Sequence, residues 1–231
     1  MKMRKVVLMY HSISEEEWIY SVPLDLFKKH LELINTYPDR VVLTFDDAYL
    51  DIFHPLMELN ILCQTIVFAP ARCIGKDIDG RKVMDLEQLR RLKAKGVKIG
   101  LHGLTHQPIG SLEHLEFELN RGKEILGDLL SEEFLFSFPN GIIPDGCEQV
   151  LKRQGVDWAF SSEPGIWKGQ YIAPRFVIRR SEILRELEAI VRFSYPVIAA
   201  RKLERISLCL VKSLLGLDRY EKLKRFLLRK T

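Results

Sequence analysis

The stretch V-V-L-T-F-D-D, from Val41 to Asp47, decides both the fold class and the position of the site. Its first five residues, Val41–Phe45, are apolar or β-branched, which predicts a strand buried on both faces. Two adjacent carboxylates, Asp46 and Asp47, follow where that strand ends. Active sites of parallel α/β folds lie at the carboxyl ends of their strands. The stretch therefore predicts chemistry at this point.

The segments around this stretch alternate between strand and helix. Apolar runs predict further strands at Val6–Tyr10, Thr65–Ala69, Val97–Leu101, Phe134–Phe138, Trp158–Ser161 and Ile172–Ile178. Amphipathic spacing and capping residues predict helices at Pro23–Tyr37, Phe53–Leu59, Asp85–Gly96, Leu112–Leu130 and Asp145–Gln154. This order indicates an α/β fold, with a parallel sheet or barrel inside and helices outside.

Charge is spread unevenly along the 231 residues. The chain has a net charge of +4, but residues 192–231 hold 11 Lys or Arg against 3 Asp or Glu, which gives that stretch +8 and leaves residues 1–191 with −4. A mildly acidic body argues against a nucleic-acid-binding domain, and we expect no nucleic-acid partner. The basic stretch could bind an anionic surface.

The cysteines and apolar runs bear on the compartment. The four cysteines are scattered, without a C-x-x-C pair, at Cys63, Cys73, Cys147 and Cys209. They fit neither a zinc knuckle nor a disulfide framework, so buried free thiols are expected. The apolar run Val6–Tyr10 is too short for the core of a signal peptide, and no run is long enough to cross a bilayer. We expect a cytoplasmic protein.

A second segment at a strand end carries two histidines. H-G-L-T-H, His102–His106, directly follows the predicted strand Val97–Leu101. Two histidines and one carboxylate form a recurrent set for a catalytic zinc or similar ion, with coordination positions left for water and substrate. A second carboxylate beside the ligand can accept the proton of the water. Taken singly, the aspartates could lie in a solvated turn and the histidines at an ordinary surface; their shared location favours a metal-dependent hydrolase.

Four motifs together resemble the polysaccharide deacetylases, the carbohydrate esterase family 4 group that shares the NodB homology domain. T-F-D-D-A (Thr44–Ala48) is similar to that family's T-F-D-D-G, and H-G-L-T-H (His102–His106) is similar to its H-[ST]-x-x-H. F-S-F-P-N-G (Phe136–Gly141) is similar to the F-x-Y-P-x-G form of the third motif. M-Y-H-S-I-S (Met9–Ser14) is similar to the Y-H motif that opens one branch of the family. The likeness runs from about Val6 to Ile178.

The resemblance implies a fold and a set of roles. The fold is a distorted, incomplete (β/α) barrel. One divalent ion, expected to be zinc, is held by Asp47, His102 and His106. Asp46 is the general base, and the backbone N–H of Asn140 helps to hold the oxyanion of the tetrahedral intermediate.

The chain also departs from the family pattern. Ala48 replaces a glycine, and Gly103 replaces a hydroxyl residue. No histidine follows His114, so we assign the general acid to His11, as the Y-H branch implies, with ordinary packing near a strand end as the alternative. The third motif lacks the arginine that orients the base in many members. Arg175 is the candidate to replace it, although an ordinary surface ion pair is the alternative.

These observations predict a metal-dependent deacetylase that removes an N-acetyl group from a sugar, with a lipid- or nucleotide-linked glycan precursor as the expected substrate. A deacylase acting on a cyclic imide or ureide at the same metal site is one alternative. A catalytically inactive binding or scaffold protein is another, and Ala48 and Gly103 are the features that favour it.

The apolar spacing beyond the barrel is helical from Leu203 to Leu227, with basic residues mostly off the apolar stripe. We therefore expect residues 1–191 to form the deacetylase-like domain and 192–231 a basic amphipathic helical tail. Such a helix can dock on its own domain, on a partner, or on an anionic membrane. The last possibility predicts an enzyme bound peripherally to the inner face of the cytoplasmic membrane.

Overall fold

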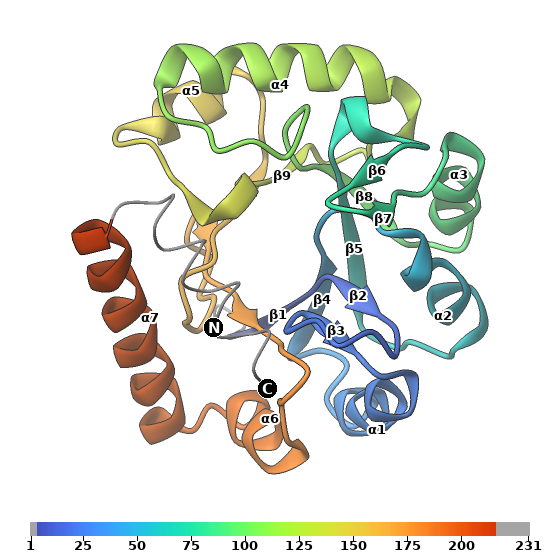
Figure 1. The fold of residues 1–231 in the computed structure, drawn as a ribbon, viewed down its shortest axis with the longest axis vertical. Helices are drawn as coiled ribbons and strands as arrows, with labels where there is room; N and C mark the ends of the chain where they lie inside the picture. The colour runs from blue at the N-terminus through green and yellow to red at the C-terminus, as the bar shows by residue number, and fades with distance from the viewer. Residues whose placement is uncertain (1–3, 216–231) are drawn as a thin grey trace.

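The computed structural model describes residues 4–215, with side chains through residue 207. Eight strands form one sheet in the order β11-β10-β9-β8-β5-β4-β1-β12, and every neighbouring pair is parallel. Their bounds are β1 Val6–Tyr10, β4 Val41–Phe45, β5 Gln64–Ala69, β8 Lys98–Leu101, β9 Leu135–Ser137, β10 Trp158–Phe160, β11 Ile172–Ala173 and β12 Phe176–Val177. Figure 1 shows the sheet curled on itself with helices arranged around it. The α/β class is confirmed.

The barrel does not close, because its two edge strands are not hydrogen-bonded to each other. The edges are β11 and β12, which are separated in the chain only by Pro174 and Arg175. The predicted single strand Ile172–Ile178 is therefore wrong: the chain leaves one edge of the sheet at Pro174, which has no N–H for a ladder, and joins the other edge two residues later. The expected distorted, incomplete barrel is confirmed.

The predicted helices are present with shifted ends. The structure has α1 Leu24–Asn35, α2 Phe53–Glu58, α3 Leu86–Ala94, α4 Leu112–Leu126, α5 Cys147–Arg153, α6 Leu184–Val191 and α7 Tyr195–Leu215. Asp85 caps α3 through a capping box with Gln88, as expected. The predicted helix to Leu130 ends early, because Gly127 takes a positive φ of 48° and the chain continues as a 3₁₀ turn.

Two short sheets lie between the main elements and were not predicted. β2 Ser12–Ile13 pairs with β3 Ser21–Val22, and β6 Asp77–Ile78 pairs with β7 Arg81–Lys82. Strands of two residues are too short to show a period in the sequence. Because β2 follows β1 directly, the first of these sheets lies at the carboxyl end of the barrel.

Alternating side chains of the strands fill the barrel interior. One buried cluster contains Val7, Val42, Ile66, Phe68, Leu135, Phe160 and Ala173. Along β4, Val42, Thr44 and Asp46 share one face because side chains alternate along a strand. The apolar interior therefore ends in a carboxylate at the carboxyl end of the barrel. The larger core lies between the outer face of the sheet and the helices.

The described start of the tail docks on its own domain. Arg201 binds the carboxylate of Glu182 at 2.6 and 2.7 Å, and Arg205 binds Glu163 at 2.9 Å. Ile198, on the same helix, is buried. Leu203 and Ile206 remain 65% and 54% exposed. The rest of the predicted stripe, to Leu227, lies outside the described side chains. No helix among the described residues is long and apolar enough to cross a membrane.

Candidate metal centre and catalytic groups

Every site residue expected from the sequence lies at or near the carboxyl ends of the strands. Asp46 and Asp47 follow β4, His11 follows β1, His102 and His106 follow β8, Asn140 lies in the 3₁₀ helix Pro139–Gly141 after β9, and Arg175 precedes β12. These groups come from five separate segments of the chain. Their common location follows from the parallel sheet, in which all strand ends meet at one rim.

The three expected ligands converge on one point. Ligand atoms of Asp47, His102 and His106 all lie within 4.8 Å of one another. The Oδ1 atom of Asp47 is 3.0 Å from Nε2 of His106 and 3.4 Å from Nε2 of His102. This oxygen is buried, yet it has no hydrogen-bond partner with acceptable geometry among the described residues. A buried, unpaired carboxylate oxygen is costly unless a cation compensates it, so the donor set fits a divalent ion.

The local backbone fixes how these ligands point. Nδ1 of His102 is 3.0 Å from the carbonyl oxygen of Ser137, which leaves Nε2 to face the other ligands. Asp47, His106 and Asn140 adopt positive φ angles of 69°, 61° and 57°. Non-glycine residues rarely take this conformation, and strained residues concentrate at functional sites. Ala48 also has a positive φ, of 52°. Alanine is thus accommodated where the family has glycine, at a cost of about 1 kcal/mol.

The second departure from the family pattern is compensated by a residue that the sequence analysis missed. A side chain at Gly103 would place its Cβ 2.8 Å from Oε2 of Glu118 and 3.0 Å from Pro139. The buried carboxylate of Glu118, on α4, occupies this space and accepts a hydrogen bond from the N–H of Leu104. It thereby holds the loop between the two histidines. The sequence indicated this residue only indirectly, because Glu118 lies on the same face of the helix as the apolar Leu115 and Leu119.

We expect Glu118→Ala to weaken divalent-metal affinity by about 10- to 100-fold, because groups that support metal ligands have effects of that size. The measurement is a competitive metal titration against a chromogenic chelator. Glu116→Ala is the matched control, since Glu116 lies on the same helix but pairs with the distant Arg153. Equal affinities for the two variants would show that Glu118 does not support the metal loop.

Arg175 is fully buried and makes a bidentate ion pair with Asp46. Its two terminal nitrogens lie 2.7 and 2.8 Å from the two carboxylate oxygens. Its remaining donors reach the Ser161 carbonyl oxygen at 2.8 Å, Ser137 Oγ at 2.8 Å and Thr44 Oγ1 at 3.2 Å. All five N–H groups are thus satisfied. The alternative of a surface ion pair is wrong, because Arg175 has 0% exposure.

Through the same contacts, Arg175 can orient Asp46 in place of the arginine that the third motif lacks. Ser137 stands in that motif, and its hydroxyl donates to Asp46 at 3.2 Å while it accepts from Arg175. The guanidinium enters instead from the seam of the barrel, between β11 and β12. It connects Asp46 on β4 with the ends of β9 and β10, so it also stabilises the open edge of the barrel.

Electrostatics keep Asp46 ionised. Burial by itself raises the pKa of this carboxyl, but the charge and hydrogen bonds of Arg175, with His102 and His11, outweigh it and hold the pKa well below its usual range. Burial lowers the pKa of His102 despite the two nearby carboxylates. The imidazole is therefore neutral at neutral pH, which is the form that binds a metal ion.

The charges of Asp46 and Asp47 act on the His11 imidazole. Its Nδ1 atom is buried and has no hydrogen-bond partner among the described residues. Its ring is 4.8 Å from that of Tyr20 and 6.1 Å from that of Trp18. Burial lowers its pKa, while Asp47 and Asp46 act in the opposite direction. His11 is therefore within electrostatic reach of both carboxylates and also packs against two aromatic rings, so its role as the acid stays a prediction.

Asn140 lies next to the metal loop. Its side-chain amide donates to the carbonyl oxygen of His106 at 2.9 Å. Its backbone N–H belongs to the first turn of a 3₁₀ helix, where N–H groups have no partner within the helix. The oxyanion role of this N–H stays a prediction.

Comparison with known proteins identifies the family. The polysaccharide deacetylase family model matches residues 34–159, more than half of the chain. YxkH of Bacillus subtilis (strain 168), whose name assigns it provisionally to the polysaccharide deacetylases, is 24% identical over 186 residues, which cover 69% of this chain. The chain spans 64% of the length of that relative.

Solved structures share the fold. IcaB from Ammonifex degensii is similar with a TM-score of 0.68 and 18% identity, covering 81% of this chain and 95% of that one. The Streptococcus pyogenes deacetylase PplD, solved with acetate, is similar with a TM-score of 0.66 and 19% identity, covering 78% and 95%. With the family match and the motifs at the barrel rim, these findings show that the chain belongs to the polysaccharide deacetylase family.

Proposed function

We propose that this protein is a metal-dependent hydrolase that removes an N-acetyl group from a sugar. The convergence of Asp47, His102 and His106 beside the ionised Asp46 is the observation that carries the proposal. Nε2 of His102 is 3.9 Å from Oδ2 of Asp46, so ligands and base border the same space. The family match supports deacetylation, and the donor set supports a divalent ion, with zinc as the expected one.

Each group then has one task. A divalent ion bound by Asp47, His102 and His106 would polarise the amide carbonyl and acidify water. Asp46 accepts the proton of the attacking water, and Arg175 holds its carboxylate in place. The backbone N–H of Asn140 donates to the oxyanion.

His11 completes the proposal as the acid that protonates the leaving amine. We expect His11→Ala to depress kcat on an amide substrate about 10²- to 10⁴-fold, with little change in KM. An ester with a good leaving group needs no protonation, so its turnover should change far less. Side-by-side kinetics on an N-acetyl sugar and an activated acetate ester provide the measurement. Equal losses on both substrates would assign His11 a structural or binding role.

We further propose a cytoplasmic location and a lipid- or nucleotide-linked sugar as substrate. Cys63, Cys73 and Cys147 are free in the described part of the chain, which suits a reducing compartment. The +8 charge of residues 192–231 suits the anionic inner face of a membrane, where lipid-linked sugars are presented.

A substrate panel tests the function. It holds a nucleotide-linked N-acetyl sugar, a polyprenyl-linked one and a free N-acetylglucosamine oligomer, which are assayed for acetate release, and a cyclic imide, which releases no acetate and is assayed for ring opening. Each substrate is tested with and without a chelator. We expect chelator-sensitive acetate release from the linked sugars. Turnover of the imide alone would favour the non-sugar deacylase. No turnover of any substrate by metal-loaded protein would favour the inactive scaffold.

The membrane proposal has its own test. A chain ending at Leu215 keeps the ion pairs of Arg201 and Arg205 with the barrel, so it should fold and remain active on a soluble substrate. The full chain should sediment with anionic vesicles and be released by high salt, because each basic residue near the surface contributes about 1 kcal/mol. The shortened chain should stay in solution. Equal sedimentation of both chains would exclude residues 216–231 as the membrane contact.

A further inference from the structure

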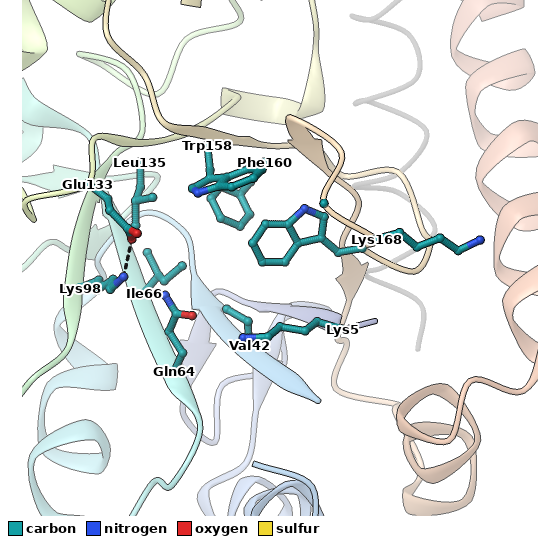
Figure 2. Close-up of a pocket in the computed structure, with 12 residues that line it drawn as sticks. Lys5, Val42, Gln64, Ile66, Lys98, Glu133, Leu135, Trp158, Phe160 and Lys168 are labelled. Atoms are coloured by element: carbon teal, nitrogen blue, oxygen red, sulfur yellow. Dashed lines mark hydrogen bonds and ion pairs between the residues drawn. The ribbon is translucent and has the colours of Figure 1, made fainter. Parts of the chain in front are cut away.

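A second cavity opens at the opposite end of the barrel from the metal ligands. It has a volume of about 340 Å³. Its walls come from the starts of the strands: Val42 on β4, Gln64 and Ile66 on β5, Lys98 on β8, Leu135 on β9, and Trp158 on β10. Figure 2 shows these side chains facing a common space. The amino ends of barrel strands are ordinarily packed for stability, so an open cavity there is unexpected.

Packed side chains separate this cavity from the metal centre. Phe68 and Phe160 lie in the barrel interior between the two ends, with their ring centroids 5.1 Å apart. A Cβ on Gly100 would come within 2.6 Å of the Phe68 ring, so the interior is filled at this level. The cavity is therefore separate from the space bordered by Asp46, Asp47 and His102.

Contacts within the protein hold the walls of the cavity. Its mouth is bordered by the segment that carries Trp167, and Lys5 and Trp167 exchange two backbone hydrogen bonds of 2.9 Å. The indole N–H of Trp167 donates to the Gln170 carbonyl oxygen at 2.9 Å. The rings of Trp158 and Trp167 meet edge to face, with centroids 5.1 Å apart. These contacts fix both indoles, so a ligand would meet a rigid aromatic wall.

The polar groups at the cavity are few and mainly cationic. Lys98 is paired with Glu133. Within residues 4–207, neither the Lys5 ammonium nor the Gln64 amide has a recorded side-chain hydrogen bond or ion pair. Figure 2 places Lys5 and Gln64 on the side of the cavity opposite Trp158 and Phe160, while Lys168 extends away from it. An apolar chamber with a few convergent polar groups has the character of a small-molecule site.

We propose that this cavity binds an amphipathic carboxylate, such as a medium-chain fatty acid. The aliphatic side chains of Val42, Ile66 and Leu135 take the apolar body. Lys5 holds the carboxylate by a charge-assisted hydrogen bond, and Gln64 donates a second one. The excess of lysine over acid at the rim favours an anion over a cation. The aliphatic floor does not suit a sugar, which needs several hydrogen-bonding groups.

Tryptophan fluorescence provides a direct test, because two of the three tryptophans line this cavity and the third, Trp18, lies at the other end of the barrel. In a Trp18→Phe background, decanoate should change the emission saturably, with one site per chain. Its affinity should exceed those of decanol and decyltrimethylammonium by about tenfold or more, since a charge-assisted hydrogen bond contributes roughly that factor.

Lys5→Gln should weaken decanoate binding about tenfold and leave decanol binding unchanged. It retains the backbone pairing with Trp167, so the fold should persist, and thermal unfolding monitors this. Lys29→Gln, on the exposed face of α1, is the control and should change nothing. Equal affinities for decanoate and decanol, or no effect of Lys5→Gln, would overturn the proposal. Binding that occurs only after removal of residues 216–231 would do so as well, because the tail would then be the natural occupant.

Discussion

Asp46→Asn is expected to lower kcat by about 10²- to 10⁴-fold while the divalent ion stays bound. The asparagine cannot accept the proton of the attacking water, but the three ligands remain unchanged. Its amide oxygen can still accept a hydrogen bond from Arg175, which limits the disturbance of the barrel. Metal content and acetate-release kinetics on the same preparation provide the measurement.

Asp47→Asn is the matched control for this experiment, because it changes the adjacent residue in the same way. It should weaken metal binding itself, since Asp47 supplies the buried oxygen between the two histidines. Loss of turnover with metal retained would identify Asp46 as the base, and loss of metal would identify Asp47 as a ligand. Near-normal turnover by metal-loaded Asp46→Asn would show that the base is another group.

Arg175→Gln is expected to destabilise the fold by about 3–5 kcal/mol, because it leaves a buried carboxylate without its cation. Folding lowers the pKa of Asp46, so the ion pair stabilises the protein above about pH 4, the ordinary value of an aspartate. This stabilisation declines as the pH falls toward the lowered value. The difference in unfolding free energy between wild type and variant should therefore narrow at low pH.

The same variant should change the pH dependence of catalysis. Without the guanidinium, burial dominates and the pKa of Asp46 rises, so the acidic limb of the kcat/KM profile should move to higher pH. Arg175→Lys keeps a charge but loses the two-pronged contact, and it should show a smaller shift. Arg179→Gln is the control, because Arg179 pairs with Glu204 away from the site. An unchanged acidic limb in both Arg175 variants would remove Arg175 from the positioning of the base.

The meeting of the three proposed metal ligands could be expected from the sequence because each follows a strand with a clear apolar run. Val41–Phe45 and Val97–Leu101 both ended in polar motifs, and a parallel sheet brings such ends together. The structure brings Asp47, His102 and His106 to one point without any change to the predicted set. Of the two departures from the family pattern, Gly103 suits the left-handed backbone at its position, whereas Ala48 adopts the same conformation at an energetic cost.

Other features could not be predicted because they depend on contacts distant in the chain. The burial of Arg175 follows from the break between β11 and β12, which an uninterrupted pattern over Ile172–Ile178 concealed. Glu118 gave a weaker signal, a charge on the buried face of a helix, and its partner Leu104 is 14 residues away. The second cavity combines the first residues of several strands, which no local pattern connects.

Metal content per chain tests the central claim most directly. Purified protein should carry about one divalent ion per chain, measured by elemental mass spectrometry. His106→Ala should lose that ion, since His106 is a proposed ligand whose partly exposed side chain can be removed without opening the core. His54→Ala, at an exposed position on α2, should retain it. Full occupancy in His106→Ala, or equal loss in both variants, would contradict the assigned site.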